Sequence, residues 1–215
     1  MRHIRISAVA AGAALLLAGC GPKTLALPED PIDRAATCGV VAAIEARAAI
    51  TDIKAPLPFE AQEHVLHYSL LAGAEGESFS LEAANRVTKR LTELQGEITE
   101  GKWKDLLPTC HAAFPAAQTT EISLPADRFD AQLQCDELGD FITTALGSQD
   151  VHYVKRLNEY GELARKLDQR LGPGLRSRAG AGLEAQQEAR RKALATVAKL
   201  GSPSAVMKQC VERYG

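Results

Sequence analysis

The stretch EAQEHVLHY holds the residue types that bind metal ions. Glu60, Glu63, His64 and His67 are spaced so that one helix would carry all four on neighbouring faces. A metal site needs three or four converging ligands, usually from more than one helix. The pattern also differs from HExxH, in which two histidines four residues apart flank a glutamate next to the first. We therefore interpret the stretch as a half-exposed helix face, with His64 and His67 kept as candidates for a metal site and for a metal-dependent hydrolase.

No other stretch carries a catalytic signature that its spacing supports. The sequence contains no GxSxG, no phosphate-binding loop, and no CxxCH at Cys110 and His111 that would attach haem. A Cys–His nucleophilic site needs a free thiol, which a disulfide would remove. We therefore predict no catalytic residue and no cofactor, and the hydrolase that would use His64 and His67 stays open as the enzymatic alternative.

Two further features are interpreted as structural. The basic run 190–192 lies in a mixed-charge segment with Glu184 and Glu188, which is typical of a solvated helix face. Trp103 is the single tryptophan and falls at an expected helix junction, where we interpret it as part of the core.

The sequence contains the same start twice, as LPEDPIDRAATC ending at Cys38 and as LPADRFDAQLQC ending at Cys135, 97 residues later. The ends of the two segments also recur, as LLPTCHAAFP around Cys110 and VMKQCVERYG around Cys210. Both place an aromatic residue four positions after the cysteine. The matches in order predict an internal duplication of about 90–100 residues.

The duplication also suggests how the cysteines pair. Four cysteines allow three pairings. The repeat favours Cys38–Cys110 and Cys135–Cys210, which would join the first helix of each repeat to its last. The rival pairing, Cys110–Cys135 with Cys38–Cys210, would join the repeats to each other and stays open at this point.

The repeated start is typical of the beginning of a helix. Asp30 and Asp127 suit the N-cap, where a side-chain oxygen accepts an unpaired backbone N–H. Pro31 then stands at the first helical position, where a missing donor costs nothing. Asp33 and Asp130 would oppose the positive end of the helix dipole.

Helical residue types dominate the rest of the chain, so we predict an all-α fold of two tandem four-helix repeats, each closed by one disulfide. The predicted helices cover residues 31–50, 59–73, 81–100 and 106–114, then 128–146, 149–171, 183–200 and 203–214. We expect residues 172–182 to form a loop. The predicted organisation is a signal peptide over 1–19, a tether over 20–26, repeat 1 over 27–115, a linker over 116–123 and repeat 2 over 124–215.

The N-terminus predicts export. Arg2 and Arg5 precede an apolar stretch over residues 6–18, too short for the roughly 20 residues of a spanning helix. The residues LAGC that end at Cys20 resemble the lipobox of bacterial lipoproteins. The resemblance implies cleavage before Cys20, acylation of Cys20 and, with Gly at position 21, sorting to the periplasmic face of the outer membrane.

The expected function follows from this location. Removing residues 1–19 would leave 23 basic residues against 27 acidic ones, from 25 and 27 in the full chain, and that weak charge argues against nucleic acid as a partner. We expect a membrane-anchored periplasmic lipoprotein that acts as a non-catalytic binding or scaffold module for an envelope protein or a client. A periplasmic chaperone and the hydrolase that uses His64 and His67 are the alternatives.

Overall fold

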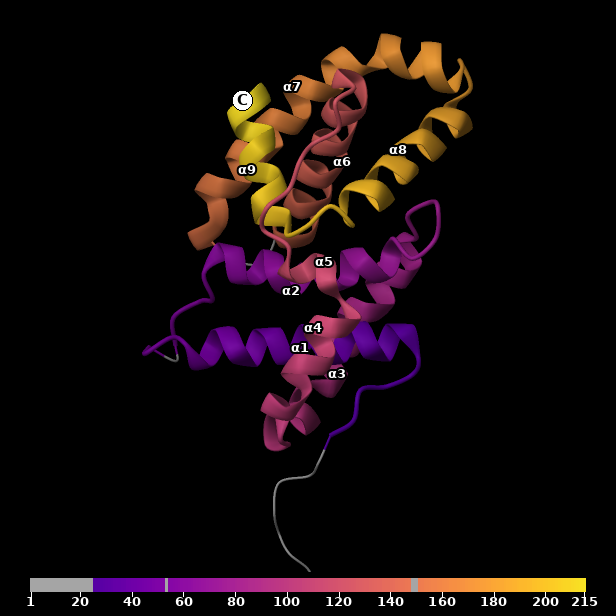
Figure 1. Ribbon diagram of the computed structural model, residues 1–215. Helices are drawn as coiled ribbons and strands as arrows, with labels where there is room; N and C mark the ends of the chain where they lie inside the picture. Colours follow the sequence, from indigo (N-terminus) through magenta and orange to yellow (C-terminus); the bar gives the residue numbers. More distant parts are fainter. Residues whose placement is uncertain (1–24, 53, 148–150) are drawn as a thin grey trace, which may run out of the picture.

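The computed structural model describes residues 25–52, 54–147 and 151–215, and every regular element in these ranges is helical (Figure 1). The all-α prediction is therefore confirmed. The α-helices are α1 (Pro31–Ala48), α2 (Phe59–Gly73), α3 (Leu81–Glu100), α4 (Leu107–Ala113), α5 (Pro115–Gln118), α6 (Arg128–Leu146), α7 (Val154–Ala179), α8 (Leu183–Val197) and α9 (Pro203–Tyr214). Two 3-10 helices, η1 (Trp103–Leu106) and η2 (Val151–Tyr153), precede α4 and α7.

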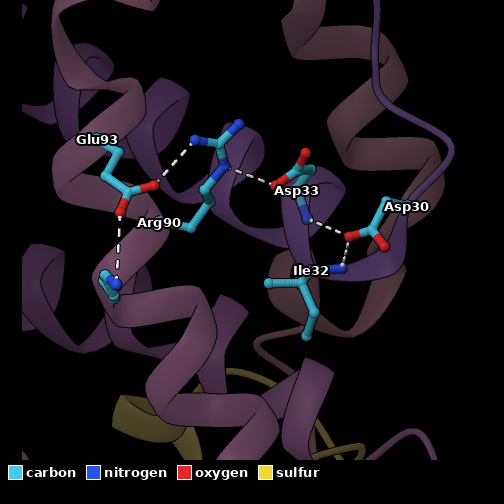
Figure 2. Close-up of polar contacts among 6 residues, drawn as sticks. Asp30, Ile32, Asp33, Arg90 and Glu93 are labelled. Carbon is cyan, nitrogen blue, oxygen red and sulfur yellow. Dashed lines mark hydrogen bonds and ion pairs between the residues drawn. The ribbon is translucent and has the colours of Figure 1, made fainter.

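The start of α1 shows why its sequence forms a helix. Oδ1 of Asp30 accepts hydrogen bonds from the backbone N–H groups of Ile32 and Asp33, each at 2.9 Å (Figure 2). These bonds satisfy two of the donors that a helix start leaves unpaired. Asp33 then accepts from Arg90 of α3 at 2.7 Å, and Arg90 also pairs with Glu93 at 2.9 Å. The cap of α1 is thereby tied to the middle of α3.

The start of α6 repeats the cap with a different partner. Asp127 accepts from the backbone N–H of Asp130 at 3.0 Å, as Asp30 does in α1. Here both carboxylates pair with Arg178 of α7, at 3.0 and 3.2 Å. The Arg178 guanidinium also lies 4.5 Å from the centre of the Phe129 ring. The same helix start is therefore held by a different helix in each part of the chain.

Helix α7 is longer than predicted. The expectation of a loop over residues 172–182 is wrong, because the helix continues through Pro173 and ends at Ala179. Leu171 and Leu175 are buried in the core, so tertiary packing outweighs the cost of an interior proline. Gly174 permits the close approach of Phe129, since a Cβ there would lie 2.4 Å from the ring.

The region around Cys110 also differs from the prediction. The helix expected over 106–114 is the shorter α4, which begins at Leu107 directly after the 3-10 helix η1 and ends at Ala113. The expected linker over 116–123 contains most of α5. Its later residues are held by the second part of the chain, since Thr119 accepts from the Ser202 N–H at 2.7 Å and Ile122 accepts from Gln209 at 2.8 Å.

Two disulfides connect the ends of the repeated segments. Cys38 of α1 is bonded to Cys110 of α4, and Cys135 of α6 is bonded to Cys210 of α9. These are the pairs that the repeat favours, and they close stretches of 72 and 75 residues. All four cysteines lie in the core, where each bond fixes the first helix of its segment against the last.

The helices form two groups that share an interface, with α1–α5 below and α6–α9 above in the view of Figure 1. We call residues 25–118 the first half and residues 119–215 the second half. One cluster of buried apolar side chains lies entirely within the first half. The other belongs mostly to the second half but includes six buried residues of the first: Phe59, Leu66, Leu70, Ala74, Phe79 and Ala84. The larger core therefore crosses the interface. None of the described helices is long and apolar enough to cross a membrane.

The cap of α1 gives a first prediction. Replacing Asp30 with Ala removes the acceptor of two N–H groups and should lower the free energy of unfolding by about 1 kcal/mol. Asp30→Asn keeps a side-chain acceptor and is the matched control, so it should retain most of the stability. Urea unfolding of the three proteins measures the difference. Equal losses in both variants would show that the charge, and not the capping bonds, stabilises the start of α1.

Candidate functional site

Helix α2 is buried on two sides. One side contributes Tyr68 and Ala72 to the core of the first half. The other contributes Phe59, Leu66 and Leu70 to the core that it shares with the second half. A helix that packs on both sides leaves little room for polar groups, yet two ionisable residues lie on the side that faces the second half.

Glu63 and His67 are these two residues, and each is fully buried. They are four residues apart, so they lie one above the other on α2. Oε2 of Glu63 accepts a hydrogen bond of 2.5 Å from the Ser204 hydroxyl at the start of α9. Nε2 of His67 lies 2.7 Å from the carbonyl oxygen of Ala198 at the end of α8. Since a carbonyl only accepts, Nε2 carries the proton and donates it.

Both contacts join α2 to helix ends of the second half. Ser204 follows Pro203 at the amino end of α9, where the helix dipole favours a negative charge. Ala198 is the C-cap of α8, where unpaired carbonyls need a donor and the dipole favours a positive charge. The carboxyl and the imidazole therefore each meet the helix end that suits their charged form.

Burial nevertheless dominates the protonation of both groups. It raises the pKa of Glu63 to about 7, although the Ser204 hydrogen bond acts to lower it. It lowers the pKa of His67 to about 4, although the bond to the Ala198 carbonyl acts to raise it. Each group thus resists the charge that it would carry in water. One atom of each, Glu63 Oε1 and His67 Nδ1, is buried without a hydrogen bond to the described residues.

A cleft of about 390 Å³ opens above Glu63 at the edge of the interface. Arg156 and Tyr160 of α7 and Lys208 of α9 form part of its lining. Arg156 connects the halves, with a contact of 3.5 Å to Glu60 and one of 3.1 Å to Glu159. Burial and the neighbouring Glu63 raise the pKa of Tyr160. Glu63 is itself among the residues that line the cleft, although almost none of its surface is exposed to water.

Further contacts extend the interface on both sides. The Tyr153 hydroxyl donates to the carbonyl of Leu57 at 2.6 Å, and the Tyr153 ring lies 5.4 Å from that of Phe59. On the other side, the Phe79 N–H donates to the carbonyl of Arg191 at 3.2 Å. Ser78 donates to Glu188 at 3.1 Å. Backbone, aromatic and polar groups together hold the halves in one arrangement.

These positions correct the interpretation of EAQEHVLHY as a half-exposed helix face. His67 and Glu63 are interior residues, and burial also lowers the pKa of His64. The His64 ring packs edge-on against Tyr68, 5.5 Å between centres. The bond from Nε2 of His67 to Ala198 leaves Nδ1 as the ring atom that could bind a metal, but the described residues contain no group of three or more side chains suited to a metal ion. The geometry around His64 and His67 therefore does not favour a metal site.

The other predicted site residues lie apart from this interface. Asp30 and Asp127 cap α1 and α6, and the two disulfides lie in the cores of separate halves. Cys20 lies outside the described residues. The structure thus brings Glu63 and His67 together with Ser204 and Ala198, which the sequence analysis did not select. A signal for the first pair exists, because Phe59, Glu63, Leu66, His67 and Leu70 follow one helical stripe.

Each half contains a groove lined by residues of three of its helices. In the first half, a groove of about 380 Å³ between α1, α2 and α3 is lined largely by apolar side chains, among them Val40, Ala43 and Leu91. In the second half, a groove of about 510 Å³ between α6, α7 and α8 is lined largely by charged side chains. By the 97-residue offset of the repeat, Val40 and Ala43 correspond to Glu137 and Asp140, which line the second groove.

Arg190 organises the charged groove. It pairs with Asp136 at 2.8 Å, Glu137 at 2.5 Å and Asp168 at 2.5 Å. Burial raises the pKa of Asp136 to about 7 and also raises the pKa of Glu137. The interpretation of the basic run as a solvated face is therefore wrong for Arg190, which links α8 to α6 and α7.

The buried carboxyl gives a second prediction. Because the pKa of Glu63 is raised from 4.5 to about 7, the stability that its neutral form contributes is present below pH 4.5 and lost as the pH rises through 7. Glu63→Gln cannot ionise. Its free energy of unfolding, relative to the natural protein, should therefore rise by about 3 kcal/mol between pH 4.5 and 8. Urea titrations across this range test it, with Glu60→Gln as the control for lost charge. A relative stability that stays constant would contradict the buried position of Glu63.

His67 gives the opposite prediction. Its pKa falls from 6.5 to about 4 in the folded protein, so stability is present above pH 6.5 and lost as the pH falls through 4. His67→Gln keeps a side-chain N–H donor but does not titrate. Relative to the natural protein, its free energy of unfolding should increase by about 3 kcal/mol as the pH falls from 7 to 3.5. The same titrations measure this, and a difference with the reverse slope would rule out the neutral buried imidazole.

Comparison of the chain with protein-family models, curated proteins and solved structures gives no significant match.

Proposed function

We propose that the chain is a lipoprotein of the bacterial envelope, anchored through Cys20 to the periplasmic face of the outer membrane, that acts as a non-catalytic binding or scaffold module. The main support for this proposal is the pair of disulfides that follow the LAGC sequence in the chain. Disulfides that close 72 and 75 residues persist in oxidising compartments such as the periplasm. A chain exported there and acylated at Cys20 would remain tethered to the membrane.

The arrangement of the helices in repeats is part of the same proposal. We infer two tandem four-helix repeats, of which the first comprises α1 to α4 and the second α6 to α9. The equivalent disulfides and the equivalent caps Asp30 and Asp127 support this. The second helices differ in length, since α2 has 15 residues and α7 has 26. Divergence after duplication would explain the difference.

The two grooves support a binding role. In the proposed repeats they would lie at corresponding places, but one is largely apolar and the other is lined by Asp136, Glu137, Asp168 and Arg190. A duplicated module whose copies carry different linings can hold two different chemical groups of one partner. Of the alternatives, the hydrolase is disfavoured because the described residues bring no group of three or more side chains suited to a metal ion to His64 and His67. A chaperone stays an alternative that the partner analysis below tests.

Acylation of Cys20 is the prediction that tests the anchor. Cells that express the natural protein should incorporate labelled palmitate into it, and the protein should sediment with the outer membrane. Cys20→Ala should carry no label and should not sediment with membranes. A Cys38→Ala/Cys110→Ala variant controls for the loss of other cysteines and should keep the label. Unlabelled natural protein would overturn the proposed anchor.

The partner is tested by crosslinking in intact cells, with a tag at Gly215 and Cys20 retained, followed by mass spectrometry. One dominant envelope protein would support a scaffold and identify its pathway. Many clients in small amounts would favour the chaperone, which should then also suppress the acid-induced aggregation of a client protein. The same spectra without reduction report the cysteine pairs.

A further inference from the structure

The described chain begins against the lower end of the first half in Figure 1. The Leu25 side chain packs on Gly101, where α3 ends, and a Cβ on Gly101 would lie only 2.7 Å from Leu25 Cδ1. Leu25 and Leu27 both pack against the core of the first half, as does Trp103 of η1. The path by which the chain leaves the fold is therefore fixed by packing, next to η1.

The residues around this exit combine an aromatic ring with lysines. Trp103 is partly buried, and it lies between the exposed Lys102 and Lys104. Nζ of Lys104 lies 5.6 Å from the centre of the Trp103 ring. Tryptophan is enriched at the boundary between hydrocarbon and water, and lysine stems lie along apolar surface while the ammonium stays in water.

Charge alone would not hold this surface on a membrane. Glu100 and Asp105 are exposed close by, and they offset the two lysines. The affinity must therefore come from the lipid, whose acyl chains contribute about 0.8 kcal/mol for each buried methylene. The surface would add orientation rather than strength, because Trp103 and the lysines suit the headgroup layer.

The length of chain between Cys20 and Leu25 limits how far Leu25 can lie from an acylated Cys20. Five residues extend at most about 18 Å, since each spans no more than about 3.6 Å. The polar layer on each side of a bilayer is about 5–8 Å thick. The exit next to η1 is thus the part of the fold nearest to an acylated Cys20, while the connection between α7 and α8 lies at the opposite end in Figure 1.

We propose that Leu25, Lys102, Trp103 and Lys104 form a membrane-facing surface that rests among the lipid headgroups, so that the second half and its charged groove point away from the bilayer. This proposal rests on the lipid anchor at Cys20 proposed above. It assigns Trp103 two contacts, one with the core of the first half and one with the membrane.

The single tryptophan makes the proposal directly measurable. The lipidated natural protein is reconstituted into phosphatidylcholine–phosphatidylglycerol vesicles that carry a spin-labelled quencher near the headgroups. Trp103 emission should fall by more than about half, as expected for an indole at headgroup depth. The matched control is Trp103→Phe/Leu183→Trp, which moves the reporter to the start of α8, where Leu183 is 72 % exposed. The fraction of emission lost in this variant should be at least about five-fold smaller than the fraction lost by Trp103 in the natural protein.

The possible results distinguish a failure of the membrane-facing surface from a failure of the lipid anchor at Cys20. Palmitate labelling of the same preparations, together with both intact disulfides, shows that each protein is acylated and folded. Labelled proteins whose two reporters are both unquenched would overturn the membrane-facing surface and leave the anchor in place. Equal quenching of both reporters would also overturn it, since the molecule would then have no fixed orientation. Absence of the label would overturn the anchor.

Discussion

The structure depends on the burial of α2 between its own half and the second half. Because both sides of this helix pack against apolar cores, the first half cannot separate from the second without exposing Phe59, Leu66 and Leu70 to water. It would also leave the Ala198 carbonyl and the Ser204 hydroxyl without their partners on α2. The position of the charged groove relative to Leu25, where the described chain begins, follows from this packed interface.

Glu63 and His67, the two buried ionisable residues of α2, change the stability of the fold with pH in opposite directions. Ionisation of Glu63 opposes folding as the pH rises, and protonation of His67 opposes folding as the pH falls. Since the two losses run in opposite directions over the same range, they largely offset each other between about pH 4 and pH 7. The interface would therefore keep a nearly constant stability over this range.

The two disulfides stabilise the halves separately and do not cross the interface between them. Each one lies within a half and joins its first and last helices, so the halves are closed separately while α2 holds them together. Small cores gain most from such bonds, because less apolar surface is available to offset the entropy of the chain. Covalent bonds thus close each half, while the described contacts between the halves are non-covalent.

Local features of the sequence determined much of the fold. The caps Asp30 and Asp127, the apolar periodicity and the repeated cysteine segments were sufficient to predict the helices α2, α3, α6 and α9 at their observed bounds, and the repeat favoured the observed cysteine pairs. These features act over a few residues or recur at a constant offset, so a linear pattern carries them. The LAGC sequence likewise predicts an anchor from adjacent residues alone.

Only the tertiary structure decided which surfaces are covered. The extension of α7 through Pro173, the burial of Glu63 and the pairing of Arg190 with three carboxylates each depend on residues far away in the chain. A helical stripe that contains Glu63 and His67 is compatible with a half-exposed face or with a polar interface, and the difference lies in whether α8 and α9 pack against it. Burial is a property of the partner helices as much as of the residue, which is why sequence spacing alone could not reveal it.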